Sequence, residues 1–348
     1  MGEDVQKILV RRAGGYDALE YVASERVALG PREVRLAVAA IGVNFADCFV
    51  RMGLYESAKV YVGWPITPGF EVAGTVVEIG SEVRDLAVGT RVIGLTRFGA
   101  YTSELVTARE LVFEPPASWS IEEAAGFSSV ALTAWYALCH LAHARAGETV
   151  LVHSAAGGVG LIAVQIARVL GCRVIGVVRG SHKVEEAQKA GCDLVIDKGN
   201  EDIWSAVKTF APNGVEVILD ANGVETLGEG YRHLAATGRL VIYGFATMLV
   251  RGGNGRPSWP KLIWSWLRTP RFNPLDLTTS NRSILAFNLS FLFEKNEILR
   301  EALDWLLPLA EAGKILPLPY KTWPLAHAGE AHRAIETGTT VGKLILLP

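Results

Sequence analysis

The segment from Thr149 to Gly160 joins a short apolar run to a glycine-rich turn, and a helix-forming run follows it. The turn holds Gly157, Gly158 and Gly160, while Ala155 stands where the G-x-G-x-x-G pattern has its first glycine. A strand, a glycine turn and a helix in this order are typical of dinucleotide binding. The unpaired N–H groups at the helix start would bind a pyrophosphate, and Gly160 would let the helix approach the strand. The alternative is a glycine turn that binds no ligand.

The end of the next expected strand indicates which nicotinamide cofactor the chain binds. NAD-selective folds place Asp or Glu about 20 residues beyond the glycine turn, on the ribose 2′-hydroxyl. Here the strand Arg173–Val178 is followed by Arg179, Ser181 and Lys183, with no acid among them. Fixed cations bind a 2′-phosphate strongly because it carries nearly two charges. The sequence therefore favours NADPH, the alternative being that these cations are solvated residues at a helix start.

Composition limits the other classes of function. The chain has 348 residues, a net charge of −2 and 50% hydrophobic residues, which predicts two globular domains and gives no electrostatic reason to expect nucleic acid. We see no secretory signal at the N-terminus and no apolar run near the ~20 residues that span a bilayer. The four cysteines are far apart and form no C-x-x-C pair, which predicts free thiols in a reducing cytoplasm and no clustered zinc lobe.

The pattern of elements predicts an α/β fold with two parts. The first ~125 residues are punctuated by Gly and Pro, as in a β-rich domain. The strands expected there are Val34–Ala40, Glu71–Ile79, Arg91–Leu95 and Glu104–Val106. Ser120 is expected to begin a helix whose apolar stripe runs to Leu141.

From Thr149 onward, strands alternate with helices, which predicts a doubly wound parallel sheet. The expected strands are Thr149–His153, Arg173–Val178, Leu194–Ile196, Glu216–Asp220, Leu240–Tyr243 and Ile284–Asn288. The expected helices are Val159–Leu170, Lys183–Lys189, Ile203–Phe210, Glu225–Ala235 and Ile298–Ala312. We expect the closing strand Lys343–Leu347 to return to the first domain and make it discontinuous.

The segment from Thr247 to Arg282 has an unusual composition. It contains six cations, three tryptophans and a single acid, Asp276. The cations are Arg251, Arg256, Lys261, Arg268, Arg271 and Arg282, and the tryptophans are Trp259, Trp264 and Trp266. One interpretation is a lid over an apolar substrate or a patch that touches an anionic membrane. The other, which we prefer from the sequence, is a subunit interface or a packed surface helix.

Taken together, these features resemble the zinc-independent quinone oxidoreductase branch of the medium-chain dehydrogenase/reductase superfamily. The resemblance rests on the glycine turn and on the motifs at 42–47, 51–55, 68–74 and 341–344, and it covers nearly the whole chain. Within the branch, the chain looks closest to the vesicle amine transport protein homologues. It implies a Rossmann domain at 127–289 and a GroES-like catalytic domain at 1–126 and 290–348. It also implies a homodimer formed by pairing of the sixth strands, here Ile284–Leu289.

By the same resemblance, zinc-dependent relatives have Cys at position 44 and His at position 70. This chain has Asn44 and Phe70. Neither side chain can replace a thiolate or an imidazole as a zinc ligand, so no metal is expected.

The resemblance further implies which residues form the site. Asn44 and Tyr55 would lie beside the nicotinamide, and Asp47 would cap a helix or position its neighbours. Lys183 would hold the 2′-phosphate, and Lys198 would either add a cation near the adenine or be solvated. The other positions expected to contact the cofactor are Thr133, Ala156, Gly157, Gly158, Val159, Gly160, Arg179, Ser181, Asn222, Gly244, Phe245, Phe287, Asn288, Leu289 and Lys343.

The expected reaction is hydride transfer from NADPH to a quinone or to the β-carbon of an enone. Without a metal, the Asn44 amide and the Tyr55 hydroxyl are the groups that would polarise the substrate oxygen. Tyr55 or solvent would supply the proton, the alternative being that Tyr55 only forms part of the wall. Two other functions stay open: an enoyl-thioester reductase, and a non-enzymatic NADPH-binding scaffold that touches lipid or a partner through residues 250–270.

Overall fold

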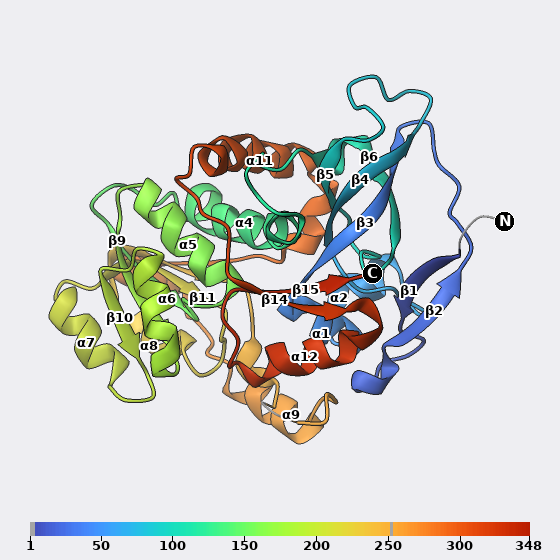
Figure 1. Cartoon of the computed structure of the whole chain (residues 1–348). Helices are drawn as coiled ribbons and strands as arrows, with labels where there is room; N and C mark the ends of the chain where they lie inside the picture. The colour runs from blue at the N-terminus through green and yellow to red at the C-terminus, as the bar shows by residue number, and fades with distance from the viewer. Residues whose placement is uncertain (1–3, 251–252) are drawn as a thin grey trace.

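The computed structural model describes residues 4–250 and 253–348, and its two large sheets lie side by side (Figure 1). One sheet has six strands in the order β10-β9-β8-β11-β12-β13, and every neighbouring pair is parallel. In chain order these strands are β8 (Thr149–His153), β9 (Arg173–Val178), β10 (Leu194–Asp197), β11 (Val215–Asp220), β12 (Leu234–Ile242) and β13 (Ser283–Ala286). This order confirms the predicted doubly wound fold.

Helices cover both faces of this sheet because its strands are apolar on both sides. Along β8, Val150 and Val152 pack into a core shared with one set of helices, while Leu151 between them packs into another core. The first set is α4 (Ser128–Trp135), α5 (Gly158–Val169), α6 (Val184–Lys189) and α11 (Asn296–Glu311). The second set is α7 (Ile203–Phe210) and α8 (Leu227–Arg232).

The other sheet belongs to the β-rich part and includes the end of the chain. Its order is β14-β15-β3-β4-β5-β7, and β6 also pairs with β3. These strands are β3 (Glu33–Val43), β4 (Glu71–Ile79), β5 (Arg91–Leu95), β6 (Glu104–Ala108), β7 (Val112–Phe113), β14 (Tyr320–Pro324) and β15 (Lys343–Leu347). Because β15 pairs antiparallel with β3, the tail returns to this sheet as expected. The domain boundaries themselves, and pairing of the β13 edge with a second copy, stay predictions.

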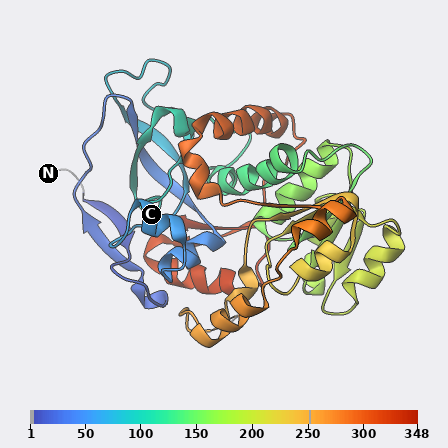
Figure 2. The ribbon, with the colours of Figure 1, turned by 180° about the vertical axis from the view of Figure 1, so that it is seen from behind.

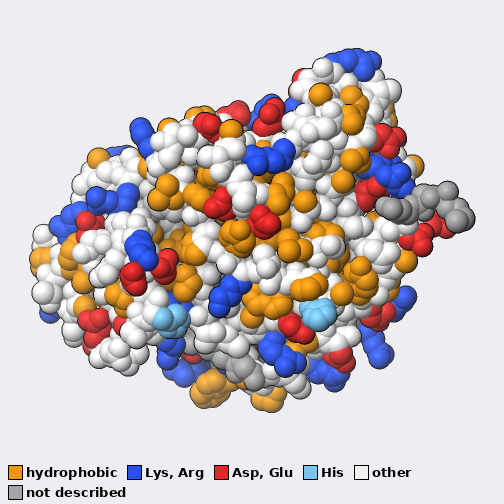
Figure 3. Space-filling view, in the orientation of Figure 1, with side chains coloured by type: hydrophobic (Ala, Val, Ile, Leu, Met, Phe, Trp, Pro, Cys, Tyr) orange, Lys and Arg blue, Asp and Glu red, His pale blue; other side chains and the backbone are white. Residues whose placement is uncertain are grey.

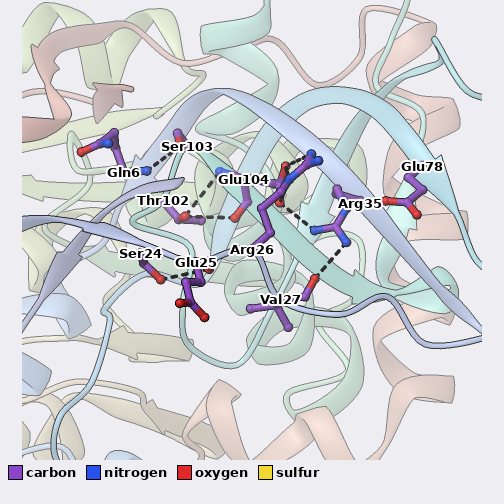
Figure 4. Close-up of polar contacts among 10 residues, drawn as sticks. All are labelled: Gln6, Ser24, Glu25, Arg26, Val27, Arg35, Glu78, Thr102, Ser103 and Glu104. Atoms are coloured by element: carbon purple, nitrogen blue, oxygen red, sulfur yellow. Dashed lines mark hydrogen bonds and ion pairs between the residues drawn. The ribbon is translucent and has the colours of Figure 1, made fainter. Parts of the chain in front are cut away.

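Four shorter helices complete the β-rich part: α1 (Phe45–Arg51), α2 (Glu56–Tyr61), α3 (Ile121–Ala125) and α12 (Ala328–Thr337). A hairpin of β1 (Val5–Leu9) and β2 (Glu20–Ser24) bonds Ser103, just before β6, through Gln6 (Figure 4). At their centre the buried Arg35 bonds Glu104 at 2.6 Å and Glu78 at 2.7 Å, and Arg26 adds a second cation on Glu104. These ion pairs fix the strands that lead into the site.

Several expected elements differ in extent from the prediction, and β12 begins at Leu234 rather than at Leu240. The helix from Ser120 is interrupted after α3 at Gly126, where a Cβ would lie 3.2 Å from the Lys343 side chain. Ser120 does cap α3 by accepting from the N–H of Glu123. Beyond α4 the chain continues as a π-helical turn, Tyr136–Leu141. The helix expected at 225–235 stops at Arg232, because β12 already begins at Leu234, which pairs with Val215. The sixth strand, expected to reach Asn288, ends at Ala286.

The tryptophan-rich segment forms α9 (Trp259–Arg268) and α10 (Pro274–Ser280), and Arg251 lies outside the described residues. Helix α9 projects from the lower edge of the molecule in both views (Figures 1 and 2). Five apolar side chains on it are between 58 and 66% exposed: Trp259, Ile263, Trp264, Trp266 and Leu267. Helix α9 thus packs on the chain through Ser265 and leaves most of its apolar side chains uncovered, so the alternatives stated for this segment stay predictions. No helix in the described part of the chain has the length and apolar character needed to cross a membrane.

Candidate cofactor and active site

The glycine turn lies between β8 and α5, at the carboxyl edge of the parallel sheet. Gly157 caps α5, and a Cβ at Gly160 would lie 2.3 Å from the carbonyl oxygen of Ser154. Only glycine allows the helix to start this close to the strand. The other sheet reaches the same place, because the N–H of Gly342 donates to the carbonyl of Ala156 at 3.0 Å. The turn therefore lies where the two parts of the chain meet.

A buried donor without a partner lies next to this turn. Asn222 follows β11, is 2% exposed, and accepts a hydrogen bond from the hydroxyl of Ser154 at 3.2 Å. Its Nδ2 has no hydrogen-bond partner among the residues that the structure describes. An unsatisfied buried donor is costly, and a ligand with an acceptor would satisfy it. Gly244 and Phe245 follow the adjacent β12, and a Cβ at Gly244 would lie 2.9 Å from the Ala221 carbonyl. These residues fit a nucleotide.

The turn after β9 carries the residues expected at the 2′-phosphate. Arg179 and Ser181 are exposed. Lys183 is buried, and its Nζ donates to the carbonyl of Gly338 at 2.5 Å. His182 bonds the neighbouring carbonyl of Thr339 at 3.1 Å. The turn therefore presents cations and also joins the Rossmann part to the loop before β15.

An acid that the sequence argument overlooked lies under this turn. Asp197 ends β10, and its carboxylate accepts from the N–H groups of Gly180 and Gly199 at 2.9 and 3.0 Å. These bonds, that from Gly180 first, lower the pKa of Asp197. Since protein donors already satisfy the carboxylate, it supports the turn. The signal in the sequence was its place at the end of the next strand. Lys198, directly after it, is half-buried.

A buried ion pair joins the β-rich sheet to α4. The ammonium of Lys343 lies 2.8 Å from Oε1 of Glu71 and 2.9 Å from Oδ1 of Asn44, while Nδ2 of Asn44 donates to the same Glu71 oxygen at 3.0 Å. The other Glu71 oxygen accepts from the hydroxyl of Ser128 and the N–H of Ser129. The break at Gly126 lets α4 begin here and provides these donors.

Three residues expected at the site have their polar groups bonded within the protein. The Lys343 amine, expected at the cofactor, is held inside the protein by Glu71 and Asn44. The Asn44 amide likewise donates to Glu71, so in this arrangement it is not directed at a substrate oxygen. The hydroxyl of Thr133 donates to the carbonyl of Ser129 within α4. Glu71 is a second residue that sequence reasoning missed, although it lies inside the motif at 68–74.

Asp47 is fully buried in α1 and accepts hydrogen bonds only. Its partners are the N–H of Asn44 at 2.8 Å, the N–H of Gly69 at 3.1 Å and the hydroxyl of Tyr101 at 3.0 Å. Burial raises the pKa of Asp47 to about 7, against the lowering effect of these donors. The side chain caps α1 and joins it to the loop that precedes Glu71. Its contacts are those of a positioning residue.

Tyr55 brings a hydroxyl group from the β-rich part to the end of β13. Its O–H donates to Oδ1 of Asn288 at 2.8 Å, and its ring packs edge-on against Phe70 and Phe98. Burial raises the pKa of Tyr55 to about 12, which keeps the phenol protonated at neutral pH. Phe287, just before Asn288, packs against Tyr136 with ring centroids 4.9 Å apart. Of the other expected contacts, Ala156 is buried, and Val159 and Leu289 are half-buried.

Within residues 4–250 and 253–348, one group of three side chains has the spacing of a metal site: Cys48, His332 and Glu336. The guanidinium of Arg51 lies among them, 2.9 Å from Nδ1 of His332 and 2.7 Å from Glu336. A fixed cation with two of the three ligand atoms already bonded does not fit a metal ion. The expectation that the chain binds no zinc, which rested on Asn44 and Phe70, stays a prediction.

Comparison with known proteins agrees with this architecture. Residues 158–307 match the family described as zinc-binding dehydrogenase, and residues 30–143 match the alcohol dehydrogenase GroES-like domain. The rat synaptic vesicle membrane protein VAT-1 homolog is 32% identical over 337 residues, covering 96% of this chain and 82% of its own. A 2-haloacrylate reductase from Burkholderia sp. is 32% identical over 362 residues and 99% of each chain.

Solved structures give the same result. The Escherichia coli quinone oxidoreductase complexed with NADPH superposes with a TM-score of 0.84, 29% identity and coverage of 99% of this chain and 100% of that one. The CurK enoyl reductase superposes with a TM-score of 0.83, 27% identity and 99% coverage of both chains. The chain belongs to the medium-chain dehydrogenase/reductase superfamily, in the branch that contains the quinone oxidoreductases and the VAT-1 homologues.

Proposed function

We propose that this protein is an NADPH-dependent reductase of activated carbonyl compounds, quinones or α,β-unsaturated carbonyls, and that it acts without a metal. The observation that carries the proposal is the hydrogen bond from Tyr55 to Asn288, 2.8 Å long. It brings a protonated, aromatic-lined hydroxyl to the carboxyl edge of the sheet that carries the glycine turn. The glycine turn, which would bind the dinucleotide, and the hydroxyl of Tyr55, which would donate to a substrate oxygen, thereby both lie where the two parts of the chain meet.

The residues that would hold the cofactor follow from their chemistry. The start of α5 at Gly157 would receive the pyrophosphate, the unpaired Nδ2 of Asn222 would donate to the nucleotide, and Arg179 and Lys183 would pair with the 2′-phosphate. When bound, NADPH supplies the hydride, which is accepted by a carbon conjugated to a carbonyl. The four free cysteines fit a reducing compartment such as the cytoplasm.

Tyr55 would act at the substrate oxygen, where negative charge develops, by turning its single O–H proton from Asn288 toward that oxygen. Its pKa of about 12 makes it a hydrogen-bond donor over the physiological range. The wall beside it consists of Phe70 and Phe98, whose ring centroids are 5.4 Å apart and which favour a flat substrate. The 2-haloacrylate reductase and the quinone oxidoreductase among the relatives are named for substrates with such activated double bonds.

The proposal is tested by following NADPH oxidation with a panel of quinones, small enones, 2-chloroacrylate and an enoyl-CoA. We expect turnover with at least one quinone or small enone. A preference for the enoyl-CoA would instead support an enoyl-thioester reductase, the alternative favoured by the similarity to the CurK enoyl reductase. If calorimetry detects NADPH binding but no compound is reduced, the enzymatic proposal is wrong.

The substitution Tyr55→Phe is expected to lower kcat on the best enone about tenfold or more, because general-acid and oxyanion donors typically contribute at least this much. The phenyl ring keeps the contacts with Phe70 and Phe98 but cannot donate to oxygen. Tyr61→Phe is the matched control, since Tyr61 lies in the same helical region but faces Phe291 and Arg97. An unchanged kcat in Tyr55→Phe would leave the tyrosine as part of the wall.

The double substitution Arg179→Asp/Lys183→Ala is expected to raise the Kd for NADPH roughly 10- to 100-fold and to remove the preference over NADH, since hydrogen bonds to charged groups contribute about 1.5–3 kcal/mol. The single variant Lys183→Ala measures the effect of losing the bond from Lys183 to Gly338. Any loss of stability caused by losing that bond would weaken the binding of NADPH and NADH alike. Lys189→Ala, on the exposed face of α6, is the control. A double variant that still prefers NADPH contradicts the assignment.

The exposure of α9 supports a second candidate function, contact with an anionic lipid surface. Its apolar side chains form an orange group at the lower edge in Figure 3, where Figure 1 places α9. Basic residues surround them, with Arg268 over the ring of Trp264 at 5.7 Å and Lys261 and Arg271 nearby in sequence. Aromatic and apolar side chains with flanking cations are the composition of an interfacial helix.

Sedimentation with vesicles containing phosphatidylserine tests this function. We expect the wild-type protein to sediment with anionic vesicles and not with neutral ones, and Trp264→Ser/Trp266→Ser to lose most of the binding. The control is Leu316→Ser, which removes an apolar side chain of similar exposure, 55%, far from α9 in the sequence. If the tryptophan variant sediments as well as the control does, α9 does not bind membranes.

A further inference from the structure

A line of buried polar side chains leads from Asp47 away from the cofactor site. Asp47, Tyr101, His332 and Arg51 are each 0% exposed. The Tyr101 hydroxyl lies 3.0 Å from Asp47 and 3.0 Å from Nε2 of His332. Nδ1 of His332 lies 2.9 Å from Nη1 of Arg51, and Arg51 bonds Glu336 and the carbonyl of Gly255 at 2.7 and 2.8 Å. These residues come from distant parts of the chain.

The chemistry of Arg51 gives this line a direction. A guanidinium can only donate, so Nδ1 of His332 must accept and the ring proton must lie on Nε2. Nε2 then donates to the oxygen of Tyr101, which leaves the Tyr101 proton for Asp47. Burial and the Arg51 charge lower the pKa of His332, so the ring stays neutral. Every proton in the line is therefore directed toward the carboxylate of Asp47.

Asp47 in turn determines the positions of two loops of the site. It accepts from the N–H of Asn44 and from that of Gly69, which has a φ of 97° and whose Cβ would lie 2.5 Å from the Tyr101 ring. These loops carry Asn44 and Glu71, the two partners of Lys343. We propose that Tyr101, His332 and Arg51 are positioning residues that hold Asp47 as a carboxylate and thereby fix the Asn44–Lys343–Glu71 cluster. This inference rests on the proposed reductase function.

The groups around Asp47 determine how it titrates. Burial raises its pKa to about 7, while the donors, Tyr101 among them, and the charge of Lys343 lower it. The titratable or charged residues that face this network come from several elements. They are Tyr16 between β1 and β2, Cys48 and Arg51 on α1, Tyr55 before α2, Glu71 on β4, Tyr101, His332 and Glu336 on α12, and Lys343 on β15. Removing one of these donors must raise the pKa of Asp47 further. As the pH falls, Asp47 would then become protonated at a higher pH than in the wild type.

The test compares Tyr101→Phe with wild type by ¹³C NMR of labelled aspartate carboxyls, with Asp47→Asn to assign the signal. We expect the Asp47 titration to move up by about one pH unit in Tyr101→Phe. His332→Gln, whose amide can still donate to Tyr101, is expected to shift it less. Tyr16→Phe is the matched control, because Tyr16 bonds Glu336 at the outer end of the line. It is expected to leave the titration unchanged.

The pH dependence of the Kd for NADPH is measured on the same samples. We expect weakening of NADPH binding at acid pH to follow the Asp47 titration in each variant. The inference is overturned if the carboxyl titrates alike in Tyr101→Phe and wild type, or if its shift leaves the pH dependence of NADPH binding unmoved. A protein that reduces no substrate contradicts the proposed function only, because the carboxyl signal needs no turnover.

Discussion

Lys343→Met is expected to reduce the free energy of unfolding by about 3–5 kcal/mol, because it leaves the carboxylate of Glu71 buried without its cation. Lys343 and Glu71 are 3% and 0% exposed, and their charged atoms are 2.8 Å apart. Water cannot replace the lost partner at such a site. The remaining donors, Asn44, Ser128 and Ser129, are neutral and compensate only in part. Thermal and denaturant unfolding measure the loss.

The double variant Lys343→Met/Glu71→Gln separates the missing charge from lost packing. Removing both charges is expected to restore most of the stability, since a neutral amide can still bond Ser128 and Ser129. Lys189→Met serves as the surface control: its partner Glu185 is 74% exposed, and the effect is expected to stay within about 0.5 kcal/mol. A double variant no more stable than Lys343→Met would show that the pair stabilises the fold by packing alone.

Gly160→Ala is expected to destabilise the protein by about 1–3 kcal/mol and to weaken NADPH binding at least tenfold, since the added methyl group overpacks the helix start. The methyl carbon would lie 2.3 Å from the Ser154 carbonyl and 2.7 Å from Cα of Ala155. Both are backbone atoms, which cannot rotate away as a side chain would. Helix α5 must therefore move away from β8, and its N–H groups move with it. Calorimetric titration with NADPH measures the second effect.

The comparison is Gly228→Ala, a glycine in α8 of the same domain. Its Cβ would meet nothing closer than Pro270 at 3.8 Å, so we expect unchanged NADPH binding and a stabilisation of up to about 1 kcal/mol from helix propensity. If Gly160→Ala bound NADPH as tightly as Gly228→Ala does, the glycine turn would have no part in the cofactor site.

Local patterns in the sequence were sufficient for most of the Rossmann part. The bounds of β8, β9 and α7 match the prediction because an apolar run or a helical period within a few residues determines them. The parallel, doubly wound sheet followed from the alternation of strands and helices, while the order of its strands came from the structure. The break at Gly126 was missed because the close neighbour there is the side chain of Lys343, 3.2 Å from where a Cβ would lie and far along the chain.

The site itself divides in the same way. The sequence by itself determined the glycine turn, the cations after β9 and the absence of an acid from that turn, because each is a property of consecutive residues. Only the tertiary structure decided that Lys343 pairs with Glu71, 272 residues away, and that Tyr101 and His332 meet at Asp47. Burial decides these partners: a charged or polar group removed from water must bond whatever the fold brings within reach, and no local pattern records which residue that is.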